Sequence, residues 1–324
     1  MIEAKPPHDP AHFTILFKHW QSMKNNRPQA QRSLKGVRIL SLSLNLPGPA
    51  ALQRLRQMGA NCLKIEPPAP TGSASPATGD PMSAYSPSVY AELHQGIRVK
   101  TSNLKTEAGQ KALQRELAKA DVLLTSFRPS ALSKLGLSWK SLHAQHPHLS
   151  LVTIVGSPGA AAEAPGHDLT YMADNDLITG LDLPATLYAD MGGALMTTEA
   201  VLQAVLMQRQ TSQGSFFEVA LSDAAAHLAL PRHWGLTLPG TVLGGGHAGY
   251  RVYPCQDGRL ALAALEPHFA KALCAAIGLA WTGPAMMLEP TTQQAIAKFA
   301  ASRTRKALEK LAEEHDIPLH TLAK

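Results

Sequence analysis

Val37-Arg38-Ile39-Leu40-Ser41-Leu42 decides the fold, because this stretch is rich in β-branched residues and leucine, as a buried strand is. A proline- and glycine-containing turn follows at Asn45–Pro49, and apolar residues then recur at helical spacing up to Gly59. The next apolar segment, Cys62–Ile65, has the composition of a second strand. Strand, helix and strand in this order form a βαβ unit, which predicts a parallel sheet covered by helices.

The same pattern repeats further along the chain. Helical spacing over Glu107–Lys119 precedes the apolar strand Asp121–Thr125, and a second helix precedes the strand Leu149–Val155. A long apolar helix is predicted over Thr197–Arg209, before the strand Gly214–Val219. These repeats predict a large α/β domain built on one parallel sheet.

The composition changes on either side of this domain. Residues 1–36 have the character of an N-terminal extension, and 37–225 form the large domain. Glycine-rich turns, hairpin-like strands and helices fill 226–324, which predicts a smaller α+β domain. Within the large domain, residues 67–88 are rich in Pro, Ser, Gly and Ala without periodicity, and a loop of this length indicates a nearby functional site.

The composition also excludes several classes of protein. The 324 residues carry a formal net charge of +6 and only 17% are charged, so the basic excess is thinly spread and favours an anionic ligand over a nucleic-acid surface. Three cysteines without a CxxC pair indicate neither a disulfide framework nor a structural zinc site. No signal peptide opens the chain, and the most apolar segment, Leu260–Leu279, is interrupted by charges. We therefore expect a soluble cytoplasmic protein without membrane or nucleic-acid partners.

Two motifs resemble cofactor sites but lack their context. Gly244–Gly249 satisfies the pattern GxGxxG, yet it precedes a strand-like segment instead of linking a strand to a helix, so it predicts no dinucleotide site. His143, His146 and His148 are close in sequence, but Pro147 separates the last from the others and the rings need not converge. We therefore expect neither a dinucleotide site nor a metal site from these motifs.

Three residues are candidates for acid–base or nucleophilic chemistry. His167 follows a glycine-rich turn and precedes a helix that begins near Leu169, where a helix cap or a surface position is the alternative. Asp190 stands before the long apolar helix, where a carboxylate can serve the helix N-terminus or catalysis. Glu266 follows a buried strand and would otherwise be a surface acid.

The surroundings of all three residues resemble one family. From Gly36 onward the chain is similar to the family III CoA-transferases, the CaiB/BaiF superfamily, and most of all to the α-methylacyl-CoA racemases among them. The motifs that carry the resemblance occur in the family's order: Pro47-Gly48-Pro49, Gly59-Ala60, Lys64-Ile65-Glu66-Pro67, Phe127-Arg128-Pro129, Lys134-Leu135-Gly136-Leu137, Gly166-His167-Asp168-Leu169-Thr170-Tyr171, Ala189-Asp190-Met191-Gly192-Gly193, Gly214 and Ala264-Leu265-Glu266-Pro267-His268-Phe269. The resemblance implies a Rossmann-like parallel-sheet domain and a smaller α+β domain.

The resemblance implies chemistry on an acyl-CoA thioester. In a racemase, His167 and Asp190 would exchange the proton on the carbon next to the thioester carbonyl, since an imidazole with a reference pKa of about 6.5 can act as base and as acid. Glu266 would orient the imidazole or hold its proton. In a CoA-transferase, Asp190 would be the nucleophile and would form an aspartyl anhydride. The Gly-His-Asp motif favours the racemase; the transferase is the alternative.

The resemblance also implies the ligand and the assembly. CoA would enter as a thioester substrate, with no permanently bound cofactor, and its phosphates would suit cationic side chains. The family forms interlinked homodimers, which we expect here. The residues expected to bind CoA are Lys64, Arg98, Lys105, Arg128, Pro47 and Gly48.

Three features depart from the family pattern. Ile97 replaces a phosphate-binding cation of the family, and the segment between His167 and Asp190 is shorter than in the racemases. The chain also stops at Lys324, where family members continue and return to the first domain. A CoA-binding protein without catalysis is therefore a further alternative.

Overall fold

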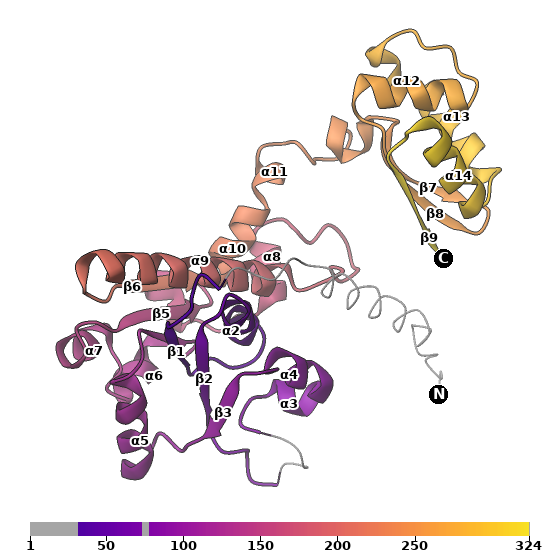
Figure 1. Cartoon of the computed structure of the whole chain (residues 1–324). Helices are drawn as coiled ribbons and strands as arrows, with labels where there is room; N and C mark the ends of the chain where they lie inside the picture. Colours follow the sequence, from indigo (N-terminus) through magenta and orange to yellow (C-terminus); the bar gives the residue numbers. More distant parts are fainter. Residues whose placement is uncertain (1–31, 73–77, 324) are drawn as a thin grey trace. The chain divides into compact units, whose positions relative to one another are not determined.

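The computed structural model describes residues 32–72 and 78–323 (Figure 1). They form two compact units, one that ends at His227 and one that begins at Leu228. The N-terminal extension expected over residues 1–36 lies outside the described residues up to position 31.

The first unit is built on a six-stranded parallel sheet. Its strands are β1 (Arg38–Ser41), β2 (Asn61–Glu66), β3 (Arg98–Thr101), β4 (Val122–Thr125), β5 (Ser150–Val155) and β6 (Phe216–Ala220). The order across the sheet is β3-β2-β1-β4-β5-β6. The predicted parallel sheet is confirmed, and β3 is the strand that the sequence pattern missed: it lies at an edge, and its exposed Arg98 and Lys100 hide its periodicity.

Helices cover both faces of this sheet, because successive side chains of a strand point to opposite faces. The helices are α2 (Pro47–Gln57), α3 (Met82–Tyr85), α4 (Pro87–Leu93), α5 (Glu107–Leu117), α6 (Pro129–Lys134), α7 (Trp139–Gln145), η1 (Gly159–Glu163), α8 (Asp168–Asp174), α9 (Tyr188–Thr211) and α10 (Leu221–Leu228). Ile39 belongs to the core with Leu55 of α2 and Val201 of α9, whereas Leu40 belongs to a second core with Leu113 of α5.

The long helix α9 begins nine residues before the predicted Thr197. Gly192 and Gly193 in its first turns read as helix breakers in the sequence. Both are buried, and a Cβ atom on Gly193 would lie 2.2 Å from the Leu221 side chain, so this glycine allows close packing against α10. Asp190 therefore lies inside the first turn of α9, a correction to its predicted position before the helix.

The second unit has its own antiparallel sheet and its own core. Its strands follow the order β7 (Tyr250–Cys255), β8 (Gly258–Ala263) and β9 (Leu319–Ala323). Its helices are α11 (Leu230–His233), η2 (Val242–Gly246), α12 (Pro267–Ala276), η3 (Pro284–Leu288), α13 (Pro290–Ala301) and α14 (Arg305–His315). Leu260 and Leu262 of β8 pack with Leu273 of α12, Ile296 of α13 and Leu308 of α14.

No helix in the described part of the chain is both long and apolar enough to cross a membrane.

Candidate active site

The sheet of the first unit carries a cavity at the point where its strand order changes direction. β1 is followed in space by β2 on one side and by β4 on the other, and open α/β sheets bind ligands beyond the carboxyl ends of the strands at such a point. A cavity of about 710 Å³ lies there. Its walls include Leu44–Pro47 after β1, Ser126 and Arg128 after β4, and Gly156 after β5.

His167 and Asp190 both line this cavity. His167 is the N-cap residue of α8, and its backbone N–H donates to the Thr170 hydroxyl at 3.1 Å. Asp190 lies in the first turn of α9. The sequence placed these residues 23 positions apart, and the fold brings them together because both helices begin at this end of the sheet.

A buried aspartate joins the starts of the two helices. Asp168, 5% exposed, is the first residue of α8, and its carboxylate accepts the backbone N–H of Asp190 at 3.0 Å. The pKa of Asp190 is raised from 3.8 to about 6: burial is the largest cause, the negative Asp168 adds to the rise, and His167 opposes it. Asp190 is therefore partly protonated near neutral pH, which suits a group that gives and takes a proton.

Two tyrosines of the cavity were not predicted as site residues. Tyr171 is buried, and Cβ atoms on Gly156 or Gly166 would lie within 2.5 Å of its hydroxyl, so both glycines make room for this phenol. Burial raises the pKa of Tyr171, Asp190 adds to the rise and Arg128 counters it. Tyr171 lies four residues after His167, about one helical turn further along, and this spacing could have indicated that the two side chains share a face.

The second tyrosine lies on the short helix α3. The Tyr85 hydroxyl donates to Asn45 Oδ1 at 3.2 Å, and both residues line the cavity. Burial raises the pKa of Tyr85, and Asp80 and Asp190 add to the rise. Tyr85 lies within the stretch 67–88 that the sequence marked as functional, although α3 and α4 begin inside that stretch.

Three of the residues expected to bind CoA lie at or beside the cavity. Arg128 is the N-cap residue of α6 and lines the cavity, as does Pro47 in the first turn of α2. Gly48 lies behind Pro47: a Cβ atom there would be 2.2 Å from the Ser43 side chain, so Gly48 lets α2 approach the end of β1.

Lys64 has a different environment from the one expected. Its side chain is 0% exposed, and its ammonium lies 2.8 Å from Glu66 and 2.5 Å from Asp80. An ammonium enclosed and paired in this way cannot also meet a phosphate at the surface, so we correct the assignment of Lys64 from phosphate ligand to buried counter-ion.

The remaining predicted cations lie apart from the cavity. Arg98 is exposed at the amino end of β3, whereas the cavity lies beyond the carboxyl ends of the strands. With Arg38 and Lys100, Arg98 lines a separate hollow of about 410 Å³. Lys105 is exposed beyond the carboxyl end of β3. Ile97, 8% exposed, belongs to the apolar core, so this position packs instead of facing a ligand.

Glu266 belongs to the second unit. It is exposed and is the N-cap residue of α12. Its predicted action on His167 stays a prediction.

The sequence model described as CoA-transferase family III matches residues 34–324. The chain belongs to this family. The combination of a six-stranded parallel sheet and a separate antiparallel sheet is thus that of a family III protein.

Individual relatives include both reaction types of the family. A succinate–glutarate CoA-transferase of Agrobacterium fabrum is 26% identical over 273 residues, 78% of this chain and 68% of the relative. An alpha-methylacyl-CoA racemase of Homo sapiens is 26% identical over 265 residues, 76% of this chain and 65% of the relative. The crystal structure of a CAIB/BAIF family protein from Brucella suis has a TM-score of 0.70 at 22% identity and covers 90% of this chain and 84% of its own. Among the curated relatives that match, the share of the relative spanned by this chain falls as low as 52%.

Proposed function

We propose that this family III protein removes and returns the proton on the carbon next to the thioester carbonyl of an acyl-CoA, as a racemase or epimerase of 2-methyl-branched acyl groups does. The observation that carries the proposal is the shared cavity of His167 and Asp190, in which the pKa of Asp190 is raised to about 6. A general acid–base group works best when its pKa lies near the working pH. A carboxylate nucleophile, by contrast, benefits from being fully ionised.

The proposed reaction conserves every atom of the substrate. In one direction the neutral imidazole of His167 takes the α-proton, and the electron pair of the broken C–H bond moves into the thioester as an enolate. The protonated carboxyl of Asp190 then returns a proton to the other face of the same carbon. In the reverse direction, the Asp190 carboxylate is the base and the imidazolium is the acid.

The cationic ligand group in the proposal is Arg128. Its guanidinium lines the cavity and suits the phosphates of CoA, which need a donor that stays charged. Lys105, beyond the carboxyl end of β3, is a second candidate. Arg98, at the amino end of β3, would bind only a part of CoA that reaches that end of the sheet. The thioester itself would lie between His167 and Asp190.

Uptake of deuterium tests the proposal directly. Acyl-CoA esters with and without a 2-methyl branch are incubated with the protein in deuterium oxide, and mass spectrometry counts deuterium at the α-carbon. We expect uptake that falls about 100-fold or more in His167→Asn and in Asp190→Asn, the usual contribution of an acid–base group. Absence of uptake across the panel would contradict the proposal.

CoA transfer between carboxylic acids is the second candidate. It is favoured by the transferases among the relatives and by the placement of Asp190 in the cavity. This route predicts a hydroxylamine-sensitive adduct on Asp190 and transfer that survives His167→Asn. A CoA-binding protein without catalysis would bind CoA and show neither uptake nor transfer.

The proposal includes the family's interlinked homodimer and a role for Glu266 in orienting the imidazole of His167. Light scattering should give a dimer at micromolar concentration, and a monomer would contradict this part. Glu266→Gln should lower deuterium uptake if its carboxylate orients the imidazole, whereas the exposed Glu313→Gln on α14 is the matched control.

A further inference from the structure

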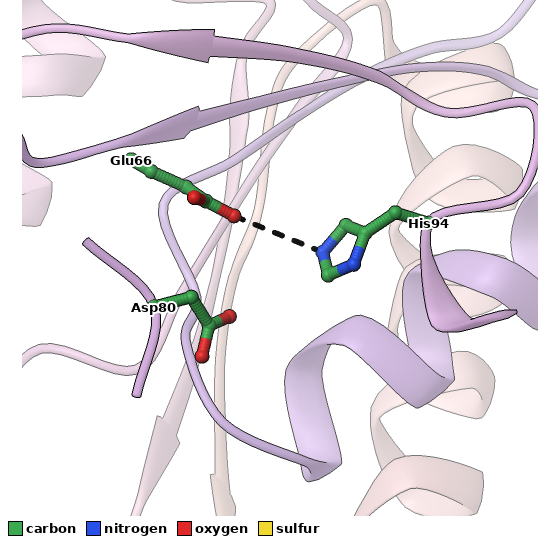
Figure 2. Close-up of side chains that lie close together, drawn as sticks. All are labelled: Glu66, Asp80 and His94. Carbon is green, nitrogen blue, oxygen red and sulfur yellow. Dashed lines mark ion pairs between the residues drawn. The ribbon is translucent and has the colours of Figure 1, made fainter. Parts of the chain in front are cut away.

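A second cluster of ionisable groups lies in the first unit, away from His167. Glu66, Asp80 and His94 are buried, and one polar atom of each lies within 4.8 Å of the others (Figure 2). Carboxylates and an imidazole at such distances could surround a metal ion. Here the Lys64 ammonium lies among them, 2.5 Å from Asp80, 2.8 Å from Glu66 and 2.8 Å from His94 Nε2, so a metal would have to displace it.

The hydrogen bonds around His94 define its role in the cluster. His94 Nδ1 lies 2.6 Å from the Tyr90 carbonyl, which can only accept, so Nδ1 carries the proton and Nε2 accepts from Lys64. Burial and the positive Lys64 lower the pKa of His94, which keeps the ring neutral. The Tyr90 hydroxyl donates to Glu66 at 3.0 Å, and Lys64 lies 5.7 Å from the centre of the Tyr90 ring. The ammonium is therefore held from several directions.

Asp80 connects this cluster to the cavity wall. Its Oδ2 accepts from Lys64, and its Oδ1 accepts the backbone N–H groups of Asn45 and Met82, each at 3.0 Å. The carboxylate is 0% exposed, so water cannot replace these bonds. One side chain thus joins β2, the loop after β1 and the start of α3.

The segments that Asp80 joins are also walls of the cavity that contains Asp190. Leu44–Pro47 line it from the loop after β1, and Pro81, Met82 and Tyr85 line it from α3. Asn45 has φ = +64°, a left-handed backbone conformation that a non-glycine residue keeps only when its surroundings hold it. The bond from Asn45 N–H to Asp80 and the bond from Tyr85 to Asn45 Oδ1 are the contacts that hold it.

The geometry points to the Lys64–Asp80 ion pair as a positioning device for the active-site wall. Lys64 fixes the Asp80 carboxylate, and Asp80 fixes the loop Leu44–Pro47 and α3 in the shape that faces Asp190. Both side chains are fully buried, and neither lines the cavity. The effect on catalysis rests on the proposed function, but the effect on the wall does not.

Hydrogen–deuterium exchange of the full chain, followed by mass spectrometry of peptides, tests this inference. We expect Lys64→Met and Asp80→Asn to speed exchange of peptides covering 42–47 and 81–86 by about tenfold, the equivalent of one lost buried hydrogen bond. Peptides covering 197–211 of α9 exchange through global unfolding and should stay protected over the short exchange times at which the wall peptides already exchange. Lys111→Met is the matched control, because its ion pair with Glu107 is exposed on α5. Equal acceleration of all peptides, or no acceleration, would overturn the inference.

A milder variant covers the case in which the buried substitutions prevent folding. Tyr85 is 64% exposed, so Tyr85→Phe removes its bond to Asn45 without disturbing a core. Exchange of peptides covering 42–47 should rise roughly threefold, and unchanged exchange there would count against the inference. If the wall loosens in the exchange experiment while no thioester is turned over by any variant or by the parent protein, the positioning role stands and the proposed function fails. If turnover is present, Lys64→Met should raise KM without moving the pH profile set by Asp190.

Discussion

Two clusters in the first unit contain the same kinds of side chain but differ in their surroundings. Glu66, Asp80 and His94 form one cluster, and Asp168, Asp190 and His167 form the other, so each holds two carboxylates and one imidazole. The first encloses a lysine ammonium and is buried on all sides. The second encloses no lysine, lines a cavity and shows an aspartate whose pKa is raised to about 6.

The difference lies in how the negative charge is compensated. In the Lys64 cluster an ammonium at hydrogen-bond distance compensates much of the buried charge, which makes the cluster a rigid support. In the Asp190 cluster burial disfavours ionisation and the negative Asp168 repels a second charge, so the pKa of Asp190 rises to about 6. One lysine thus distinguishes the fully buried cluster from the cluster that lines the cavity.

The largest expected effect comes from removing that lysine. Lys64→Met should lower the free energy of unfolding by about 3 to 5 kcal/mol, because two buried carboxylates lose their counter-ion. Urea unfolding of the parent and the variant measures the change, with Lys111→Met as the surface control, expected within about 0.5 kcal/mol. A loss from Lys64→Met as small as that of the control would remove the contrast between the clusters.

A smaller effect is expected from filling the space beside His167. Gly166→Ala places a Cβ atom against the Tyr171 ring and hydroxyl and should cost about 1 to 3 kcal/mol of stability. Gly180→Ala is the matched control, since open space surrounds that position. Equal unfolding midpoints for the two variants would show that Tyr171 moves aside freely.

Removing the ionisable group at position 190 should stabilise the protein, with a sign opposite to that of Lys64→Met. Between pH 3.8 and about 6 the unfolded state releases the Asp190 proton while the folded state keeps it, so the parent loses stability as pH rises through this window. Asp190→Asn should therefore be more stable than the parent well above pH 6 by about 3 kcal/mol and should gain little near pH 4. Urea unfolding across this pH range measures the difference, and a gain that does not depend on pH would contradict the raised pKa.

The smallest effect comes from giving the reactive cluster a cation of its own. Leu187 is the N-cap residue of α9, is exposed and lines the cavity, so Leu187→Lys places an ammonium at the start of the helix whose first turn carries Asp190. The pKa of Asp190 should fall by about 0.3 unit, which corresponds to about 0.4 kcal/mol for such a pair. The limb of the pH–rate profile set by Asp190 should move to lower pH, whereas Leu187→Gln should leave it in place. A shift to higher pH would refute the electrostatic explanation.

Much of the fold followed from local pattern. The apolar strands, the helical spacing between them and the parallel order were all predictable from Val37–Leu42 onward, because buried strands and amphipathic helices have distinct periods. The start of α9 was not predictable, because glycine at position 193 has a low intrinsic helix propensity. In the fold, the missing side chain of Gly193 makes room for Leu221, which only the tertiary structure shows. Tertiary packing decided that boundary.

The candidate site divides in the same way. His167 and Asp190 were predictable as candidates from their motifs, and the switch point of the sheet explains why they meet. The burial of Lys64 was not predictable, because Asp80 and His94 lie 16 and 30 residues further along the chain and only the fold brings them together. The local sequence, a lysine in a strand followed by an acid two residues later, does not indicate how deeply the lysine is buried.

The hydrogen bond from Asp190 N–H to the Asp168 carboxylate has a mechanical consequence. Asp168 directly follows His167, so the bond works as a strut between the start of α8, which carries His167, and the start of α9, which carries Asp190. A tilt of α8 would therefore move the first turn of α9 with it and would keep the spacing of His167 and Asp190. In the proposed reaction, acyl chains of different size would then be accommodated elsewhere in the cavity, while these two residues move together.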